Sequence, residues 1–368
     1  MNNTFDHRGG SMPAILSVGT ASLPYKVKQE EVCRYVKQLF EHSFPHIDRL
    51  LTIFDNGEIQ SRFFAQPLDW YQKDHSFSEK NDVYIESAVH YGCEAIQNCL
   101  QNDLFLEKPI AYEEVEAIFY ISTTGIATPS VEARIMNRLP FSPYTKRIPI
   151  WGLGCAGGVA GLARAYEYCL AFPNATVLVI AAEFCSLTFQ PHDRSKSNMI
   201  GTSLFADGVA CLCVAGDGTI DARIRPRIVA TQSIFMPHSE EVMGWDIRDE
   251  GLFVIFSKNI PSLIQAWLQP NVEAFLQKNG LAMNDIRHFI AHPGGKKVIM
   301  AYQEALKIGE QKTKISFDIL RNFGNMSSAT VYFVLEQFMK QPIPKGDYGL
   351  MVALGPGFSA EFTLLHWE

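Results

Sequence analysis

Three short motifs carry side chains that could perform acyl transfer. Cys155 lies in WGLGCAGG, directly before a predicted helix of small residues, where backbone N–H groups and the helix dipole would lower the pKa of its thiol. His292 follows an apolar strand and precedes Pro-Gly-Gly, so it could pair with the thiolate and donate to an oxyanion. Asn325 lies in GNMSSA, and its amide could donate to a developing negative charge. Taken singly, the three residues also have structural interpretations, as a buried thiol, a structural histidine and a helix N-cap.

The elements that must position these residues occur twice in the chain. A predicted strand at Val115–Ser122 ends in a polar loop that begins at Thr123 and leads to a helix from about Pro129. A second predicted strand at Ile286–Ala291 ends at His292 and also leads to a helix. Both strands are short apolar runs bounded by polar or glycine-rich turns, which favours an α/β fold.

The repeat extends to the elements that follow. The predicted helices and strands in the two halves are, in order, helix 156–170 with strand 176–183, and helix 326–338 with strand 349–356. The separations from Ser122 to His292 and from Cys155 to Asn325 are both 170 residues, which indicates a duplicated unit. Equivalent strand ends and helix starts could then bring these residues and Thr123 into one pocket shared by both halves.

Composition excludes several classes of protein. The chain has 368 residues, of which 47% are hydrophobic and 19% charged, as in compact globular proteins. Its net charge of −7 is the wrong sign for a protein dominated by nucleic-acid binding. Its apolar runs are far shorter than the roughly 20 residues of a membrane-spanning helix. Residues 1–11 lack the apolar core of a secretory signal, and we interpret them as a native extension or an expression remnant.

Eight cysteines without an export signal predict reduced thiols in the cytoplasm and no disulfides. Cys211 and Cys213 alternate in a predicted strand and face the same side. The paired-cysteine and histidine spacings of a zinc site are missing, so buried thiols are the favoured interpretation and we expect no metal site.

Five motifs in a fixed order resemble the type III polyketide synthases, the chalcone-synthase-like branch of the thiolase superfamily, over residues 12–368. They are WGLGCAGG, LFADG at 204–208, AHPGG, GNMSSA and ALGPGF at 353–358. The chain is most similar to the Bacillus-type alkylpyrone synthases. The resemblance implies a duplicated five-layered αβαβα thiolase-like fold, with the nucleophile in an N-terminal half at 12–220. It places the histidine and asparagine in a C-terminal half at 221–368, and it implies a homodimer.

The same resemblance implies roles for the three residues. An acyl group from coenzyme A would be loaded onto Cys155, and His292 and Asn325 would stabilise the enolate formed when malonyl-CoA loses carbon dioxide. Coenzyme A thioesters would be the substrates, with no metal or redox cofactor. We expect a long-chain fatty acyl starter and short alkylpyrone products.

The resemblance also implies a set of cavity residues, several of which depart from the plant pattern. Val254 replaces a gating phenylalanine and should widen the entrance, whereas Trp245 falls where a glycine lines the cavity and should narrow it. Thr128 replaces a methionine that reaches across the dimer interface. The remaining positions expected to contact substrate are Phe205, Thr123, Thr124, Cys185, Thr188, Ser327, Gly355 and Pro356.

The residues that bind the coenzyme A phosphates in plant enzymes are less well matched in this sequence. Arg49 is the one basic residue at three positions that are basic in plant enzymes, since Thr52 and Asn56 occupy the others. Lys296 and Lys297, just after the catalytic histidine, are candidate substitutes, and a solvated helix start is the alternative interpretation.

Three other functions compete with this interpretation. A β-ketoacyl-acyl carrier protein synthase III shares the Cys-His-Asn set but performs one condensation, and GNMSSA and the Gly-Pro-Gly-Phe segment argue against it. A non-catalytic thiolase-like partner subunit would not need the intact set. A hydroxymethylglutaryl-CoA synthase is disfavoured because Glu183 is not obviously placed as a catalytic acid.

Overall fold

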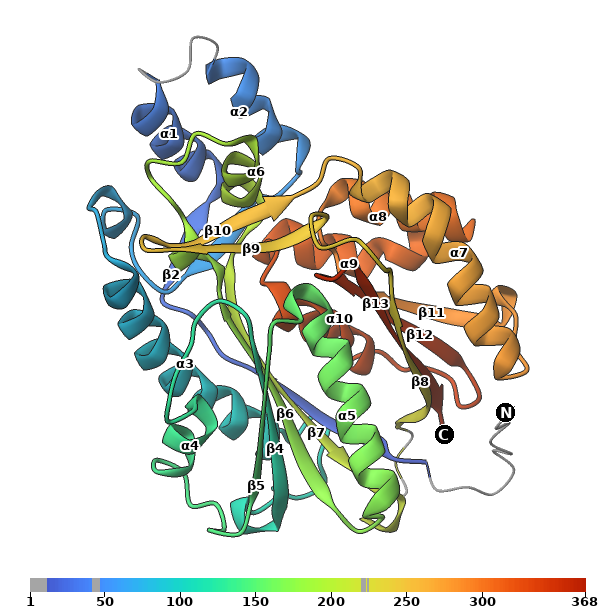
Figure 1. The fold of residues 1–368 in the computed structure, drawn as a ribbon. Helices are drawn as coiled ribbons and strands as arrows, with labels where there is room; N and C mark the ends of the chain where they lie inside the picture. Colours follow the sequence, from blue (N-terminus) through green and yellow to red (C-terminus); the bar gives the residue numbers. More distant parts are fainter. Residues whose placement is uncertain (1–11, 42–46, 220–222, 224) are drawn as a thin grey trace.

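The computed structural model describes residues 12–41, 47–219, 223 and 225–368 (Figure 1). The expected extension at 1–11 lies outside the described residues. The predicted boundary between the halves, at residues 220 and 221, also lies outside them.

The described residues form strands and helices in alternation. The strands are β1 (Ala14–Thr20), β2 (Tyr25–Lys28), β3 (Ser61–Phe64), β4 (Val115–Ser122), β5 (Lys146–Trp151), β6 (Thr176–Phe184), β7 (Asp207–Ala215), β8 (Pro226–Phe235), β9 (Met243–Arg248), β10 (Gly251–Phe256), β11 (Ile286–Ala291), β12 (Tyr348–Gly355) and β13 (Ser359–Trp367). The helices are α1 (Gln29–Phe40), α2 (Ile47–Asn56), α3 (Phe77–Leu100), α4 (Val131–Met136), α5 (Gly157–Ala171), α6 (Lys196–Leu204), α7 (Ile260–Lys278), α8 (Lys296–Leu306), α9 (Glu310–Phe323) and α10 (Thr330–Met339).

The central sheet repeats one pattern twice. Its order is β11-β12-β13-β8-β1-β7-β6-β4-β5. In the N-terminal half β1 is antiparallel to β7, β7 to β6, and β6 is parallel to β4. In the C-terminal half β8, β13, β12 and β11 are related in the same way. The halves join where Ala14 of β1 pairs with Arg227 of β8, so the duplication expected from the spacing is a duplication of topology.

Two helices lie between the two halves of the sheet, and others cover the outer faces (Figure 1). The inner core contains Val159 and Leu162 of α5 with Val331 and Leu335 of α10. The small side chains of α5 allow close packing there, and Tyr332 Oη donates to the Gly158 carbonyl at 2.7 Å. The outer helices α3 and α4 share a core with β1, β4, β6 and β7, and α7 and α8 share one with β11–β13. The layers therefore alternate α, β, α, β, α.

The elements predicted from sequence are present, with shifted helix starts. β4 and β11 have the predicted bounds. The helix expected from about Pro129 begins at Val131, and the helix expected at 326 begins as α10 at Thr330. A short 3-10 helix, η7 (Ser327–Ala329), precedes α10.

Segments inserted between the repeated strands gather at one end of the molecule. They are α1, α2, α6 and the β9–β10 hairpin, which lie together at the top of Figure 1. The hairpin forms a separate two-stranded sheet. No helix in the described ranges has both the length and the apolar character required to cross a bilayer.

Candidate active site

Cys155 lies in a tight turn that both halves of the molecule hold in place. It belongs to the 3-10 helix η3 (Gly154–Ala156), between β5 and α5, and is 8% exposed. Gly154 N donates to Thr123 Oγ1 at 3.0 Å, which ties the turn to the end of β4. From the other half, Gly355 approaches so closely that a Cβ there would lie 2.5 Å from the Leu153 carbonyl oxygen. A larger residue at 355 would therefore displace the nucleophile.

Asn325 connects the thiol to the histidine loop. Its Nδ2 donates to the Gly294 carbonyl at 3.1 Å, and its Oδ1 accepts from Ser327 N at 2.9 Å. The side chains of Asn325 and Ser327 lie close enough to the Cys155 thiol to lower its pKa. The structure therefore brings together the ends of strands and the starts of helices from both halves.

His292 lies at the end of β11 with its backbone fixed and its ring free of partners. Its N–H donates to the Val352 carbonyl of the neighbouring strand at 2.8 Å. The residue is 2% exposed, and neither ring nitrogen has a hydrogen-bond partner in the described part of the chain. Both nitrogens are therefore available to a substrate or to a transferred proton.

Burial controls the protonation of this pair. It raises the pKa of the Cys155 thiol to about 12, although the side chains of Ser327 and Asn325 act in the opposite direction. Burial also lowers the pKa of His292 to about 3. The expectation that the helix start lowers the pKa of Cys155 is therefore wrong for the resting protein, because desolvation outweighs the short 3-10 turn. Both groups rest neutral, and thiolate formation needs proton transfer to a base such as His292.

Glu183 belongs to the site, which the sequence interpretation missed. It lies in β6, is fully buried, and accepts from Thr123 N and Thr124 Oγ1, both at 2.9 Å, and from Ser328 Oγ at 2.5 Å. Burial raises its pKa, and its charge in turn raises the pKa of Cys155. The sequence analysis considered Glu183 only as a catalytic acid, whereas in the structure both of its carboxylate oxygens accept hydrogen bonds around the Cys155 turn. A single carboxylate at the end of the apolar run TVLVIAAEF was the available signal.

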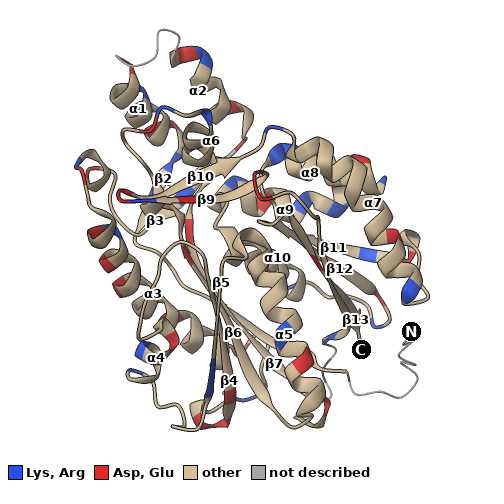
Figure 2. Cartoon of the chain, viewed as in Figure 1, with Lys and Arg blue, Asp and Glu red and all other residues tan. Residues whose placement is uncertain are grey.

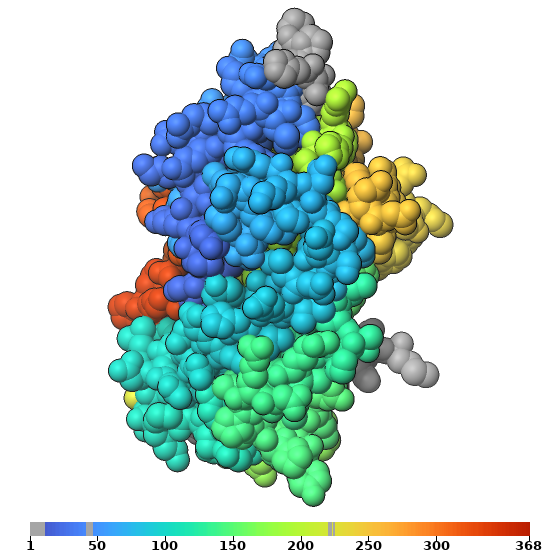
Figure 3. Space-filling view, turned by 90° about the vertical axis from the view of Figure 1, so that its left-hand side faces the viewer, coloured from blue at the N-terminus to red at the C-terminus, as the bar shows by residue number. Residues whose placement is uncertain are grey.

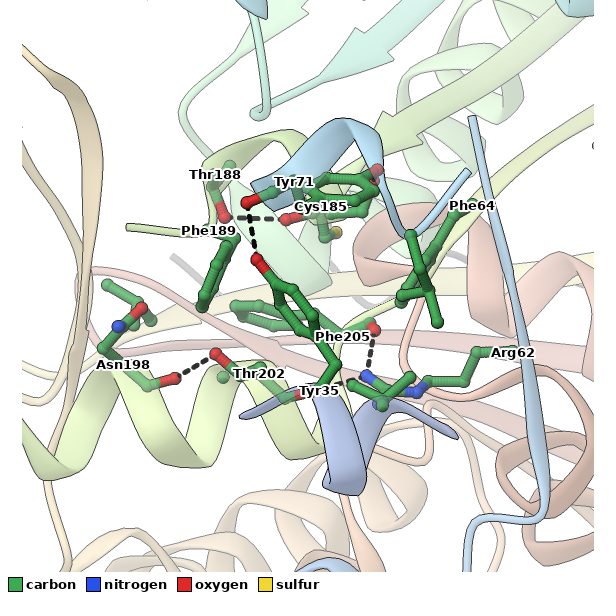
Figure 4. A pocket seen from close by; sticks show the side chains of 15 residues that line it. Tyr35, Arg62, Phe64, Tyr71, Cys185, Thr188, Phe189, Asn198, Thr202 and Phe205 are labelled. Carbon is green, nitrogen blue, oxygen red and sulfur yellow. Dashed lines mark hydrogen bonds between the residues drawn. The ribbon is translucent and has the colours of Figure 1, made fainter. Parts of the chain in front are cut away.

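A pocket lies between α1, β3 and α6 (Figure 4), and Cys155, His292 and Asn325 are not among the residues that line it. The cavity volume of this pocket is about 40 Å³. Four residues expected to contact substrate line it, and they are Phe205, Cys185, Thr188 and Val254. The other walls are largely apolar and include Val32, Phe64, Leu68, Tyr71 and Phe189. Phe205 also pairs through its backbone with Asn325, which places this wall directly beside the catalytic set.

Trp245 and Val254 lie on the same face of the β9–β10 hairpin. They are cross-strand partners in the β9–β10 hairpin, so their side chains lie on one face. The Trp245 ring centre is 5.9 Å from that of Phe205. Sequence analysis predicted a wider entrance at Val254 and a narrower cavity at Trp245. In the structure Val254 lines the pocket, and Trp245, its partner on the adjacent strand, lies near Phe205 without lining the pocket.

Most of the other residues expected to contact substrate lie near the Cys155 turn, and Thr128 does not. Thr123, Thr124 and Ser327 are buried around the Cys155 turn, and Pro356 packs on Gly154. Thr128 is exposed, after a loop that leaves the sheet, and does not line the pocket of its own chain.

The basic residues expected to bind coenzyme A lie near the same end of the molecule. Lys296 forms an ion pair with Glu58, just past α2, the helix that carries Arg49. Lys297 and Arg49 are exposed. Figure 2 shows the start of α8, where both lysines lie, as a basic segment.

Comparison with known proteins decides the family. Residues 3–218 match the family model for the N-terminal domain of chalcone and stilbene synthases, and residues 227–367 match that for the C-terminal domain. The chain belongs to the chalcone and stilbene synthase family. It is a type III polyketide synthase and an acyltransferase, as the motif order predicted.

Relatives and solved structures agree with this assignment. A provisionally named chalcone synthase of Bacillus subtilis (strain 168) is 52% identical over 363 residues, covering 97% of this chain and 99% of the relative. A 1,3,6,8-tetrahydroxynaphthalene synthase of Streptomyces peucetius subsp. caesius is 33% identical, covering 99% and 95%. The crystal structure of the corresponding synthase from Streptomyces coelicolor A3(2) superposes with a TM-score of 0.89 at 27% identity, covering 96% of this chain and 99% of that one.

Fold likeness extends to a more distant solved structure. The structure of PKS-I from the brown alga Ectocarpus siliculosus gives a TM-score of 0.90 at 23% identity, covering 99% of this chain and 100% of that one. The thiolase-like fold is therefore confirmed. Among the described residues, no group of three or more His, Cys, Asp or Glu could hold a metal ion.

Proposed function

We propose that this type III polyketide synthase loads a long-chain fatty acyl group from coenzyme A onto Cys155 and extends it with malonyl-CoA to alkylpyrones. The observation that supports this starter is the pocket beside Phe205 and Cys185. Its walls are mostly aliphatic and aromatic side chains, and burying an alkyl chain against such walls is favourable by about 0.8 kcal/mol for each CH₂ group.

Loading is a thioester exchange. His292 takes the proton of the neutral Cys155 thiol, and the sulfur attacks the acyl carbonyl of the acyl-CoA. Asn325 Nδ2, already oriented by the Gly294 carbonyl, donates to the oxyanion. The coenzyme A thiolate leaves and takes up the proton from His292. The products are acyl-Cys155 and free coenzyme A.

Extension uses the same donors a second time. Malonyl-CoA loses carbon dioxide, and the electron pair of the broken C–C bond forms a thioester enolate whose oxygen is stabilised by His292 and Asn325. The enolate carbon attacks acyl-Cys155, the C–S bond breaks, and the Cys155 thiolate is released. The product is a β-ketoacyl-CoA two carbons longer, which can reload. After two or three rounds, an enol oxygen of the chain attacks the terminal thioester, and coenzyme A leaves as the pyrone ring closes.

Coenzyme A binding is part of the proposal. Arg49 and Lys297 would interact with its phosphates near the start of α8, and Lys296 would contribute less because Glu58 already balances its charge.

We also propose a homodimer in the cytoplasm. β5 is the edge of the sheet, and most of its residues are exposed. Trp151 at its end and Ile126 nearby are 47% and 53% exposed, so a second copy pairing along β5 would cover both. All eight cysteines are free thiols, which suits a reducing compartment. Sedimentation analysis should give twice the chain mass, and a monomer would contradict the dimer.

The test of the reaction is a set of incubations with malonyl-CoA and acyl-CoAs from acetyl to stearoyl, analysed by mass spectrometry. We expect alkylpyrones from the longer starters. Products from malonyl-CoA alone would contradict the fatty acyl starter. A requirement for acyl carrier protein, or a single condensation, would favour the synthase III alternative.

A further inference from the structure

The β9–β10 hairpin forms part of the wall of the proposed acyl pocket through Val254. The hairpin carries Trp245 and Val254, and Phe256 of β10 lies 5.6 Å from the Phe205 ring, centre to centre. It forms its own two-stranded sheet, so the ladder of the central sheet does not fix its place. Figure 3 shows it (yellow) as a projection beside the chain around residue 80 (light blue) and the segment near 190–200 (yellow-green). Side-chain contacts must therefore hold it against the pocket.

Lys80 of α3 makes such contacts with two segments at once. Its Nζ donates to the Glu250 carbonyl in the hairpin turn at 3.3 Å, to the Phe189 carbonyl at 3.3 Å and to Gln190 Oε1 at 3.2 Å. Gln190 Nε2 in turn donates to the Leu252 carbonyl of β10 at 3.2 Å. We call Lys80 and Gln190 the hairpin clasp.

The clasp joins two segments that line the pocket. Phe189, whose carbonyl accepts from Lys80, lines the pocket from the loop before α6, and Val254 lines it from the hairpin. The Gln190 carbonyl accepts from Asn198 Nδ2 at 2.8 Å, so the loop is itself fixed to α6, the helix that ends just before Phe205. A change at Lys80 is therefore transmitted to the gap between Phe205 and the hairpin.

Lys80 is a charged side chain at a buried position, which is uncommon for lysine. Lys80 is only 7% exposed, and burial lowers its pKa, while the Asp74 and Glu250 carboxylates act in the opposite direction. Holding an ammonium away from water is unfavourable unless oxygens surround it, and here the three oxygens come from the two segments that must be held together.

We propose that Lys80 is a positioning residue that sets the starter chain length, because its ammonium holds the hairpin, with Trp245 and Val254, against Phe205. This inference rests on the proposed acyl-CoA function. Lys80 does not touch the reacting atoms. Without the clasp, the hairpin moves away from α6 and the pocket accepts longer chains.

The experiment compares Lys80→Met with Lys80→Arg, and with Lys278→Met as a matched control at an exposed lysine. The ratio of kcat/KM for palmitoyl-CoA to that for hexanoyl-CoA should rise about tenfold in Lys80→Met, as expected for losing hydrogen bonds to a charged group. The change should lie mostly in KM, with Lys80→Arg close to wild type. Gln190→Leu removes the other half of the clasp without a buried charge and should shift the ratio in the same direction.

A second background separates positioning from general damage to the fold. In Trp245→Gly the aromatic side chain that the clasp holds against Phe205 is gone, so adding Lys80→Met should change the ratio less than it does in the wild-type background. An equal loss of activity with both starters, in both backgrounds, would overturn the proposal.

Amide hydrogen exchange tests the clasp without relying on the reaction. Exchange within 243–256 should become faster in Lys80→Met and Gln190→Leu, while α5 stays protected. If no acyl-CoA gives a product but exchange in the hairpin rises, the proposed function fails and the positioning role stands. If exchange in the hairpin is unchanged, the positioning role fails whatever the products are.

Discussion

The two halves of the molecule share one topology but bring different chemistry to the site. In the N-terminal half Ile121 of β4 pairs with Ala181 of β6, and in the C-terminal half Ala291 of β11 pairs with Val352 of β12. Two residues farther along the second strand are Glu183 in one half and Leu354 in the other, and both are buried. The repeated frame therefore does not require a buried carboxylate, and Glu183 serves the turn that holds the nucleophile.

The difference between the halves suggests that each half serves a different step of the reaction. The N-terminal half supplies Cys155, which carries the acyl chain, with the supports that hold it. The C-terminal half supplies His292 and Asn325, which form no covalent bond to the acyl chain. Loading should depend most on the first half and decarboxylation most on the second. The following changes test that division, from the largest expected effect to the smallest.

Cys155→Ala removes the nucleophile from the N-terminal half. No acyl adduct should form, and polyketide output should fall at least about 10³-fold, since no other thiol has the same donors around it. Intact-protein mass spectrometry after incubation with acyl-CoA measures the adduct, and Cys213→Ala, at a buried thiol of β7, serves as the control. Substantial pyrone formation by Cys155→Ala would contradict the mechanism.

His292→Ala removes the base and one enolate donor from the C-terminal half. Malonyl-CoA decarboxylation should fall by about 10²- to 10³-fold, and more than loading does, because the loss of a donor acts directly on the enolate. Because burial holds the pKa of His292 at about 3, wild-type decarboxylation should show no loss on acidification through about pH 6.5. A titration midpoint there that vanishes in His292→Ala would show that the imidazole titrates near its ordinary pKa and that burial does not lower the pKa of His292.

Glu183→Gln makes the N-terminal half more like the C-terminal half by removing its buried charge. The amide oxygen can still accept from Thr123 N–H, and Ser328 can turn its hydroxyl to accept from the new NH₂ group. Because the Glu183 charge raises the pKa of Cys155, the pH profile of Cys155 alkylation by iodoacetamide should move about one unit lower. Glu361→Gln, at another buried carboxyl with a raised pKa, should leave the profile unchanged.

Lys297→Ala tests the coenzyme A contacts and has the smallest expected effect. KM for malonyl-CoA should rise about threefold with kcat unchanged, and the difference from wild type should shrink at high salt. Lys296→Ala should change KM less, because Glu58 balances that charge. A larger effect at Lys296 than at Lys297 would reverse this assignment.

Sequence alone was sufficient for the features that depend on local pattern. β4 and β11 were predicted to the residue, since each is an apolar run closed by a turn, and the 170-residue spacing revealed the duplication. The motifs identified the family because they combine five local patterns in a fixed order.

Features that depend on burial and on distant contacts were missed or wrong. The pKa of Cys155 was predicted in the wrong direction because desolvation comes from both halves of the fold. Glu183 lies 28 residues after Cys155, and its partners Thr124 and Ser328 come from different halves. The sequence did not reveal that Trp245 and Val254 are neighbours, because their contact depends on the register of β9 and β10.

The most direct test measures acyl adduct and carbon dioxide release side by side in Cys155→Ala and Asn325→Ala. A division of labour between the halves predicts opposite losses. Cys155→Ala should take up no acyl group but still release carbon dioxide from malonyl-CoA, and Asn325→Ala should retain the adduct while carbon dioxide release falls about 10²-fold or more. If each variant loses both activities to the same extent, the halves do not divide the reaction and the account is wrong.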